Sequence, residues 1–257
     1  QGKASGVQSM GNTFSEHGYE IVQGDITHLR TLRERVYKNT VAALGRPAPV
    51  LTPKYAGLRQ TDEFFNGFHQ GGLKGPALNK LRLQLQRDLT GYVGPMLFEA
   101  FPRIGELVGA DVVQQKGCNL VIAMPGDTDH VPTHRDAPLN SNFEVVCWVP
   151  LVDCFGTKSM RILNRIETKK ALELLLTEGY KAYHQYAIGH GSVLWLEFGS
   201  ACLFWAGLVH TVVTNSTQET RWSLNHRYKN YWAPYGEKGS GYFEPLRLSP
   251  LTEVGIS

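Results

Sequence analysis

The sequence has no run of basic residues, and this absence excludes one large class of function. Lysine and arginine total 26 against 23 aspartates and glutamates, which gives a net charge of +3, and they are spread along the chain. Proteins that bind the nucleic-acid backbone concentrate positive charge on one face or one helix. We therefore expect no nucleic-acid partner. Hydrophobic residues at 42% and charged residues at 19% are ordinary for a globular domain.

The sequence also lacks a long uninterrupted apolar run. Its longest apolar stretch, 192–213, contains Glu197, His210 and two glycines, and is rich in β-branched and aromatic residues. This composition favours two buried strands joined by a turn over a membrane-spanning helix. The segment after Met10 is polar and has no secretory signal pattern. We expect no membrane association and a cytoplasmic location.

Cysteine is scarce, with four residues that show no CxxC spacing: Cys118, Cys147, Cys154 and Cys202. A disulfide framework or a zinc site built from cysteines would need closer and more regular spacing. The neighbours of these cysteines are apolar. We expect buried free thiols, as in a reducing cytoplasm.

The chain divides by character into a helical part, a β-rich part and a tail. Residues 1–9 resemble the remnant of an expression tag, so we set them apart from a single domain over 10–257. The expected parts of that domain are a mostly helical segment 10–110, a β core 111–229 with a helical insert 167–178, and a C-terminal tail 230–257.

The first part contains helix start and stop signals. Asp25 can cap a helix with apolar residues at helical spacing that ends before Gly45. Pro76 opens a second helix that ends by Gly94-Pro95. A third helix is expected around 97–108. From residue 111 the chain turns to many short β-rich runs separated by turn residues, which are typical of a β-sandwich or barrel.

His134-Arg135-Asp136 and the distant His210 form the first candidate site. On a strand, residues i and i+2 point to the same side, so His134 and Asp136 can reach one metal ion. His210 follows a turn marked by Gly207 and begins another β-rich run. Two histidines and one carboxylate are the ligand set of a non-heme iron(II) oxygenase, which keeps open positions opposite its ligands. An isolated His-x-Asp sequence is common by chance, so the prediction depends on its occurrence together with the later residues of the site.

Arg221 and Ser223 extend this set toward a co-substrate. Arg221 follows His210 by 11 residues, and Ser223 shares its side of the predicted strand. A guanidinium group offers a planar fork suited to a carboxylate. Asn225 lies on the same side and can support either group. Asn119 precedes His134 by 15 residues and can bond the iron-bound carboxylate of 2-oxoglutarate, or equally pair with backbone.

The stretch from Asn119 to Tyr228 resembles the phytanoyl-CoA dioxygenase-like branch of the iron(II)/2-oxoglutarate dioxygenases. More narrowly, it is similar to oxygenases encoded beside carbohydrate and aminoglycoside biosynthesis enzymes. The residues that carry the resemblance are His134-Arg135-Asp136, Trp148 to Asp153 with Gly156, Gly199, Leu203-Phe204, His210, Asn215 and Arg221-Trp222-Ser223. The family fold is a double-stranded β-helix, or cupin-like jelly roll, with helices packed on its major sheet.

The resemblance implies a set of roles and an activity. His134, Asp136 and His210 would bind Fe(II), and Arg221 with Ser223 would bind the far carboxylate of 2-oxoglutarate. Such enzymes consume dioxygen, release succinate and carbon dioxide, and oxidise a small molecule. Because halogenating relatives replace the carboxylate ligand, the presence of Asp136 favours hydroxylation or another oxidation.

The substrate is expected to be small and polar, with a sugar or glycoside as the leading class. A polar pocket is predicted from the tyrosine-rich tail, with aromatic rings to stack on sugars, and from five further residues: Asn140, Asn142, Thr157, Lys158 and Arg161. One competing hypothesis is a cupin-type protein that binds another metal without 2-oxoglutarate, and a second is a binding module in which the histidines are structural. A third is an oxygenase with the same site that acts on a protein or an acyl-CoA.

Overall fold

The computed structural model of the chain describes residues 13–45, 59–128 and 131–256. The segment interpreted as a tag, 1–9, lies outside the described residues. No described helix combines the length and the apolar composition that a membrane crossing requires.

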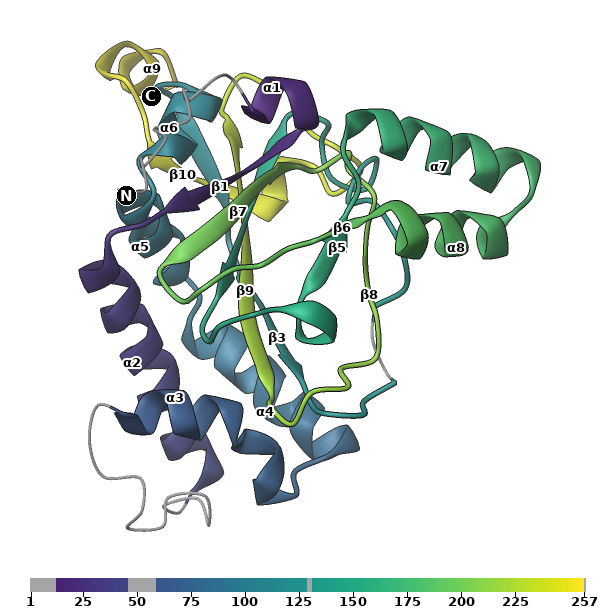
Figure 1. The fold of residues 1–257 in the computed structure, drawn as a ribbon. Helices are drawn as coiled ribbons and strands as arrows, with labels where there is room; N and C mark the ends of the chain where they lie inside the picture. The colour runs from purple at the N-terminus through teal and green to yellow at the C-terminus, as the bar shows by residue number, and fades with distance from the viewer. Residues whose placement is uncertain (1–12, 46–58, 129–130, 257) are drawn as a thin grey trace, which may run out of the picture.

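The centre of the molecule is a seven-stranded sheet with antiparallel pairing (Figure 1). Six strands follow one another across it, and β3 pairs with β9 beside β2. In spatial order the strands are β1 (Tyr19–Gln23), β7 (Ser200–Trp205), β4 (Glu144–Pro150), β9 (Arg221–Asn230), β2 (Val112–Gln115) and β10 (Phe243–Arg247), with β3 (Asn119–Ala123). The long β9 therefore contacts three neighbours and lies at the centre of the sheet.

A smaller sheet faces the large one. It has the order β6 (Ser192–Val193), β5 (Met160–Ile162) and β8 (His210–Val212), and single bridge pairs extend it. Side chains from both sheets form an apolar layer between them. The buried members of this layer are Val146, Trp148, Cys154, Met160, Ile162, Leu194, Leu196, Cys202, Phe204, Ala206 and Leu208.

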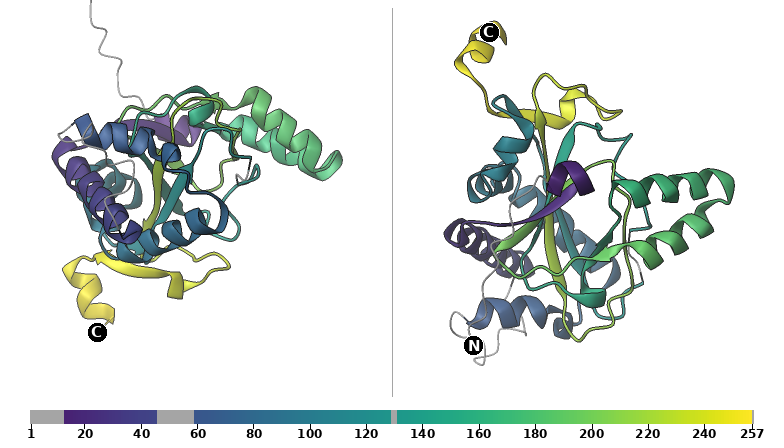
Figure 2. Two further views of the ribbon diagram at one scale, coloured as in Figure 1. Left: turned by 90° about the horizontal axis from the view of Figure 1, so that it is seen from below. Right: turned by 45° about the horizontal axis from the view of Figure 1, so that its top comes forward.

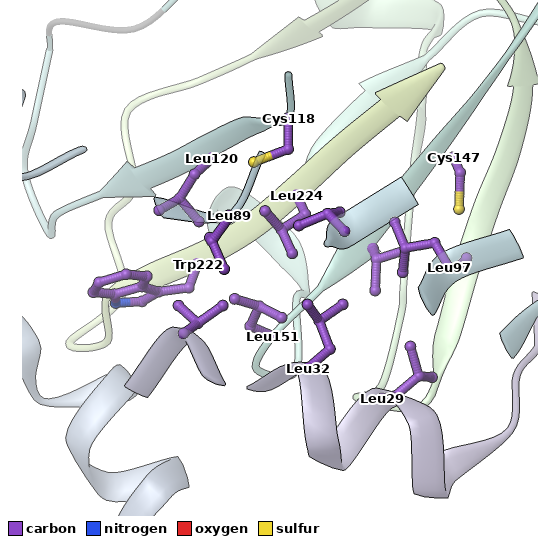
Figure 3. Close-up of a cluster of buried hydrophobic side chains, with 14 of the residues drawn as sticks. Leu29, Leu32, Leu89, Leu97, Cys118, Leu120, Cys147, Leu151, Trp222 and Leu224 are labelled. Carbon is purple, nitrogen blue, oxygen red and sulfur yellow. The ribbon is translucent and has the colours of Figure 1, made fainter. Parts of the chain in front are cut away.

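Helices cover the other face of the large sheet (Figures 1 and 2). They are α2 (Ile26–Leu44), α3 (Arg59–Asn66), α4 (Gly75–Asp88), α5 (Val93–Ala100) and α6 (Arg103–Val108). Figure 3 shows this core, in which Leu29 and Leu32 of α2 belong to the same buried cluster as Trp222 and Leu224 of β9. Because strand residues alternate, the even-numbered residues of β9 face the helices and the odd-numbered ones face the space between the sheets.

The helix signals in the sequence were correct for α2 and α4 and incomplete for the rest. Asp25 accepts a hydrogen bond from the Thr27 amide at 2.7 Å, and Gly45 ends α2 with φ of 68°. The single helix expected around 97–108 is two helices, because the chain breaks at Phe101-Pro102. Gly94-Pro95 does not end α4 but lies in the first turn of α5. Proline is tolerated there because the backbone amides of a first helical turn have no partner within the helix.

Gly94 also permits the close approach of α5 to the sheet. A Cβ atom at this position would lie 1.8 Å from Oε1 of Gln114 and 2.4 Å from Nε2 of His226. The Gly94 carbonyl accepts a hydrogen bond from the Tyr228 hydroxyl at 2.7 Å. A side chain here would push the helix away from β9.

The helical insert is a hairpin of two helices, of which the sequence indicated only the first. Asn164 caps α7 (Arg165–Thr177), and α8 (Tyr180–His190) returns beside it. All three views show this pair extending from the body of the molecule (Figures 1 and 2). Its attachment includes a short hydrogen-bond contact of 2.6 Å between His184 and the hydroxyl of Thr133.

Several short elements had no recognised signal in the sequence. They are α1 (Thr13–His17), β1, β10 and α9 (Pro250–Ile256). β1 pairs with β7 along its whole length although it lies in the segment expected to be mostly helical. β10 pairs with β2, so the tail contributes a strand to the sheet.

Candidate metal centre

The structure brings His134, Asp136 and His210 together between the two sheets. One ligand atom from each lies within 4.8 Å of the others. The two histidines are bridge partners, since each backbone amide donates to the carbonyl of the other, at 3.1 and 2.9 Å. Their ring centroids are 4.3 Å apart. Backbone pairing, and not only side-chain packing, therefore fixes the spacing of the two imidazoles.

Each imidazole is oriented by a hydrogen bond to the backbone. Nδ1 of His134 lies 2.8 Å from the Pro132 carbonyl, and Nδ1 of His210 lies 3.1 Å from the Leu208 carbonyl. A carbonyl oxygen only accepts, so Nδ1 carries the proton and donates in both rings. The lone pair of the neutral ring is then on Nε2, as metal ligation requires. Nε2 of His134 is 3.6 Å from Oδ1 of Asp136.

Asp136 presents one oxygen to the histidines and the other to an arginine. Arg227 donates to Oδ2 of Asp136 from Nη2 at 2.8 Å and from Nε at 3.3 Å. Its Nη1 donates to Oε1 of Gln115 at 3.0 Å, which holds the guanidinium group in place. Oδ2 is thus occupied within the protein. Oδ1 is the oxygen left for a metal ion.

The electrostatics keep Asp136 and His210 in the protonation states that metal binding requires, whereas, against the effect of burial, the neighbouring carboxylate of Asp136 raises the pKa of His134. Burial opposes the charge of Asp136, but the contacts with His134 and Arg227 lower its carboxyl pKa well below the usual range. Burial and the neighbouring His134 lower the pKa of His210 to about 4. At neutral pH, Asp136 is therefore an anion and His210 is a neutral ligand.

A cavity of about 260 Å³ opens beside these three residues. Its lining comes from both sheets, from α4 and from the segment before His134. The lining residues are Arg82, Asn119, Val121, Ile122, Ala123, Val131, His134, Asp136, Trp148, Met160, His210, Val212, Arg221, Ser223, Asn225 and Arg227. This list includes all seven residues predicted from the sequence to bind the metal ion or the co-substrate.

Arg221 is a buried cation without a carboxylate partner. Its side chain is 6% exposed, and Nη1 donates one hydrogen bond of 3.3 Å to the Ser159 carbonyl. Nε of Arg221, Oγ of Ser223 and Oδ1 of Asn225 are buried and have no hydrogen-bond partner. Among the described residues no carboxylate forms an ion pair with Arg221. Such a guanidinium group, with a hydroxyl on the same strand face, suits an incoming carboxylate.

The turn before β9 sets the position of Arg221. The Asn215 side chain accepts from the Thr217 amide at 3.1 Å and donates to the Glu219 carbonyl at 2.8 Å. Its backbone carbonyl also accepts from the Gly126 amide at 2.7 Å. This turn starts β9 so that Arg221 pairs with Ala123 and faces the cavity.

The two asparagines predicted to contact the co-substrate, Asn119 and Asn225, have different hydrogen-bond partners in the structure. Asn119 and Asn225 are register partners across β3 and β9. Oδ1 of Asn119 accepts from Nε2 of Gln86 at 3.2 Å, so its oxygen is engaged by a helix side chain. The amide oxygen of Asn225 is unpartnered.

Two charged residues of the cavity, Arg82 and Arg227, were not predicted from the sequence. Arg227 continues the alternation of Arg221, Ser223 and Asn225, so the period of two was a usable signal. Arg82 had no signal, because it enters the cavity from α4.

The cavity is partly polar, as predicted, but the five residues predicted to line it are not among its lining residues. They are Asn140, Asn142, Thr157, Lys158 and Arg161. Lys158 is fully buried and donates to Asn66 at 2.7 Å and to Glu219 at 2.6 Å, while Arg161 donates to the Ile188 carbonyl at 3.1 Å. Both cations are therefore engaged by partners within the protein.

No protein family model and no curated protein sequence matches this chain. Among solved structures, the non-heme monooxygenase ThoJ in its apo form is 14% identical; the match covers 92% of this chain and 82% of that one, with a TM-score of 0.52. The epimerase SnoN in complex with Fe³⁺, alpha ketoglutarate and nogalamycin RO is 16% identical over 92% of this chain and 91% of its own, with a TM-score of 0.51. Likeness at these identities shows the fold, and it confirms the predicted β core packed by helices.

Proposed function

We propose that this chain is an iron(II)- and 2-oxoglutarate-dependent oxygenase that oxidises a small polar, sugar-containing molecule. The observation that carries the proposal is the unmatched, buried Arg221 in the same cavity as the His134, Asp136 and His210 cluster. A cluster of metal ligands alone does not call for a buried guanidinium group. A dicarboxylate that binds the metal at one end and Arg221 at the other does.

The donor set fits iron(II). Two imidazole Nε2 atoms and Oδ1 of Asp136 provide three ligands from one side, the arrangement of the facial triad. Arg227 holds Oδ2 and so favours ligation by a single carboxylate oxygen. Iron(II) bound in this way supplies, with 2-oxoglutarate and dioxygen, the oxidising chemistry of such enzymes, and succinate and carbon dioxide are the products of the co-substrate.

The cavity wall along β9 fits the co-substrate. Arg221 and Arg227 lie toward the two ends of this wall, on the same face of β9. Between them, Ser223 and Asn225 offer a hydroxyl group and an amide oxygen to the space next to the metal ligands. Arg221 and Ser223 would bind the far carboxylate, and Asn119 and Asn225 would contact its metal-bound end.

Other observations support the surroundings of this chemistry. Trp148 and Met160 are 3% and 4% exposed and provide an apolar wall that limits water in the cavity. The SnoN epimerase structure with Fe³⁺ and alpha ketoglutarate shares the fold. The four cysteines are buried and free, which supports the cytoplasmic location we propose.

The decisive experiment is an anaerobic titration with Fe(II) and then 2-oxoglutarate, followed by the weak visible charge-transfer band of the chelate. We expect the band in the wild type and its loss in Arg221→Ala. Arg221→Lys should retain part of the affinity, since it keeps the charge and loses the fork. Arg87→Ala, an exposed change on α4, is the matched control and should leave the band intact.

Two results would overturn the proposal. Iron binding without a band on addition of 2-oxoglutarate would favour a cupin-type metal site with other chemistry. Failure of the wild type to bind iron would remove the metal assignment of His134, Asp136 and His210 altogether.

A further inference from the structure

Arg82 is a second guanidinium group in the cavity that lacks a carboxylate partner. It lies on α4, which packs along β3, and the next turn of the helix holds Gln86 against Asn119. Its Nη2 donates to Oδ1 of Asn79 at 2.7 Å, and its Nε is buried without a partner. Among the described residues it forms no ion pair. Unlike the other cavity arginines, Arg82 is partly exposed to solvent.

The charges of the loaded cavity leave Arg82 unbalanced. Asp136 is the one carboxylate among the lining residues that the structure describes, and Arg227 is paired with it. Under the proposed function, Arg221 is matched by the far carboxylate of 2-oxoglutarate. Iron(II) and the three cavity arginines then carry five positive charges, against three negative charges on Asp136 and 2-oxoglutarate. The positive charge of Arg82 then faces the remaining space of the cavity.

A buried donor needs an acceptor once water leaves. Water can satisfy the guanidinium group in the open cavity, but a substrate that displaces this water must replace its hydrogen bonds or lose affinity. A carboxylate or phosphate oxygen satisfies an arginine best, because its bond to the guanidinium group is charge-assisted. A neutral hydroxyl group would leave the charge unmatched.

We propose that the oxidised substrate is an anion whose carboxylate or phosphate group binds Arg82. The inference rests on the proposed function and narrows its substrate class from polar to acidic. The rest of the molecule would contact the unpartnered amide oxygen of Asn225, which suits a hydroxyl group, and the apolar side chains of Val121 and Trp148. Arg82 is thus a specificity-determining residue.

The test compares acids with their neutral counterparts on protein loaded with Mn(II) and 2-oxoglutarate without dioxygen. The probes are glucuronate against glucuronamide, and glucose 6-phosphate against glucose. Paramagnetic relaxation of the probe protons by Mn(II) measures binding near the metal and does not depend on turnover. We expect the acids to be relaxed more strongly than the neutral compounds, and Arg82→Gln to weaken acid binding by about tenfold to a hundredfold, the value of a hydrogen bond to a charged group.

Controls separate this effect from folding and from the co-substrate. Arg87→Gln removes an exposed arginine from the same helix and should bind the acids as the wild type does. The comparison of carboxylate with phosphate shows which oxyanion the site prefers. In Arg82→Gln, the charge-transfer titration with Fe(II) and 2-oxoglutarate should be unchanged, which shows that the loaded site is intact.

Three results would overturn the inference. The first is equal relaxation of the acid and neutral probes in the wild type, and the second is undiminished acid binding in Arg82→Gln. The third is weaker binding of 2-oxoglutarate in Arg82→Gln, which would show that Arg82 contacts the co-substrate. Failure of the proposed function is distinct from all three, because it appears as absence of the charge-transfer band in the wild type.

Discussion

Arg227 and Arg221 lie on the same face of one strand and are equally buried, at 7% and 6% exposed, yet their surroundings differ completely. Arg227 binds Asp136 through two nitrogens and Gln115 through a third. Arg221 has a single 3.3 Å hydrogen bond to a backbone carbonyl. One guanidinium group is matched within the chain, and under the proposed function the other is matched only when 2-oxoglutarate binds.

The difference shows how to separate a positioning residue from a binding residue. Removal of one member of a buried ion pair leaves an uncompensated charge, whereas removal of a lone buried charge takes away a desolvation cost. The two arginines should therefore respond to the same substitution with opposite effects on the metal-free protein. Four measurements test this contrast.

The largest effect is expected for Arg227→Met. Loss of Arg227 leaves Asp136 buried and unpaired, so the free energy of unfolding of the metal-free protein should fall by about 3–5 kcal/mol. Metal affinity should fall about 10–100-fold, because the orientation of the carboxylate is lost. Urea denaturation and metal titration measure the two effects.

The double variant Asp136→Asn/Arg227→Met is the control for this prediction. It removes both charges and should recover part of the lost stability. Equal stability of the double and single variants would show that the ion pair is not the origin of the effect.

Arg221→Met should not destabilise the metal-free protein, in contrast to Arg227→Met. We expect the unliganded protein to keep its stability or gain up to about 2 kcal/mol, since a desolvated charge is removed. The stabilisation by 2-oxoglutarate in the presence of Mn(II), about 2.7 kcal/mol at a concentration of 100 Kd, should disappear. Thermal unfolding with and without the ligand measures both. A large loss of stability without ligand would mean that Arg221 has a structural role.

His226 extends the comparison to the opposite face of β9. Burial and the neighbouring Arg227 lower its pKa to about 3, against about 6.5 in an unfolded chain. Between these values the unfolded chain binds a proton that the folded chain excludes, so stability is complete above pH 6.5 and falls as the pH falls toward 3. Each such group contributes up to about 1.4 kcal/mol per pH unit.

The substitution His226→Leu should therefore reduce the slope of metal-free stability between pH 6.5 and pH 4. Part of the slope should remain, because His210, with a pKa of about 4, responds in the same direction. Urea denaturation at a series of pH values provides the measurement. An unchanged slope would show that His226 does not resist protonation.

The smallest effect is expected for Ser223→Ala. Its hydroxyl group is buried without a partner in the structure, so its removal should not lower the free energy of unfolding. The affinity for 2-oxoglutarate should fall by about tenfold, the value of one hydrogen bond to a charged group. The charge-transfer titration measures this, and an unchanged affinity would move the far carboxylate away from Ser223.

The sequence predicted best what depends on neighbours along the chain. The cap at Asp25 and the alternation along β9 are local, and the structure shows both. Arg82 could not be predicted, because its place depends on the packing of α4 against β3. Lys158 was misread for the same reason, since its partners Asn66 and Glu219 are 92 and 61 residues away. The role of each buried charge depends on such distant partners.

The bridge between His134 and His210 has a consequence for hydrogen exchange. β8 has three residues, and a single bridge joins its start to the segment of His134. The amide hydrogens of both histidines lie inside this bridge, where each is bonded to the carbonyl of the other. A metal ion bound to both imidazoles must be released before the bridge opens. Metal binding should therefore slow the hydrogen exchange of both amides together. The exchange rates of these two backbone amides would then report the occupancy of the site.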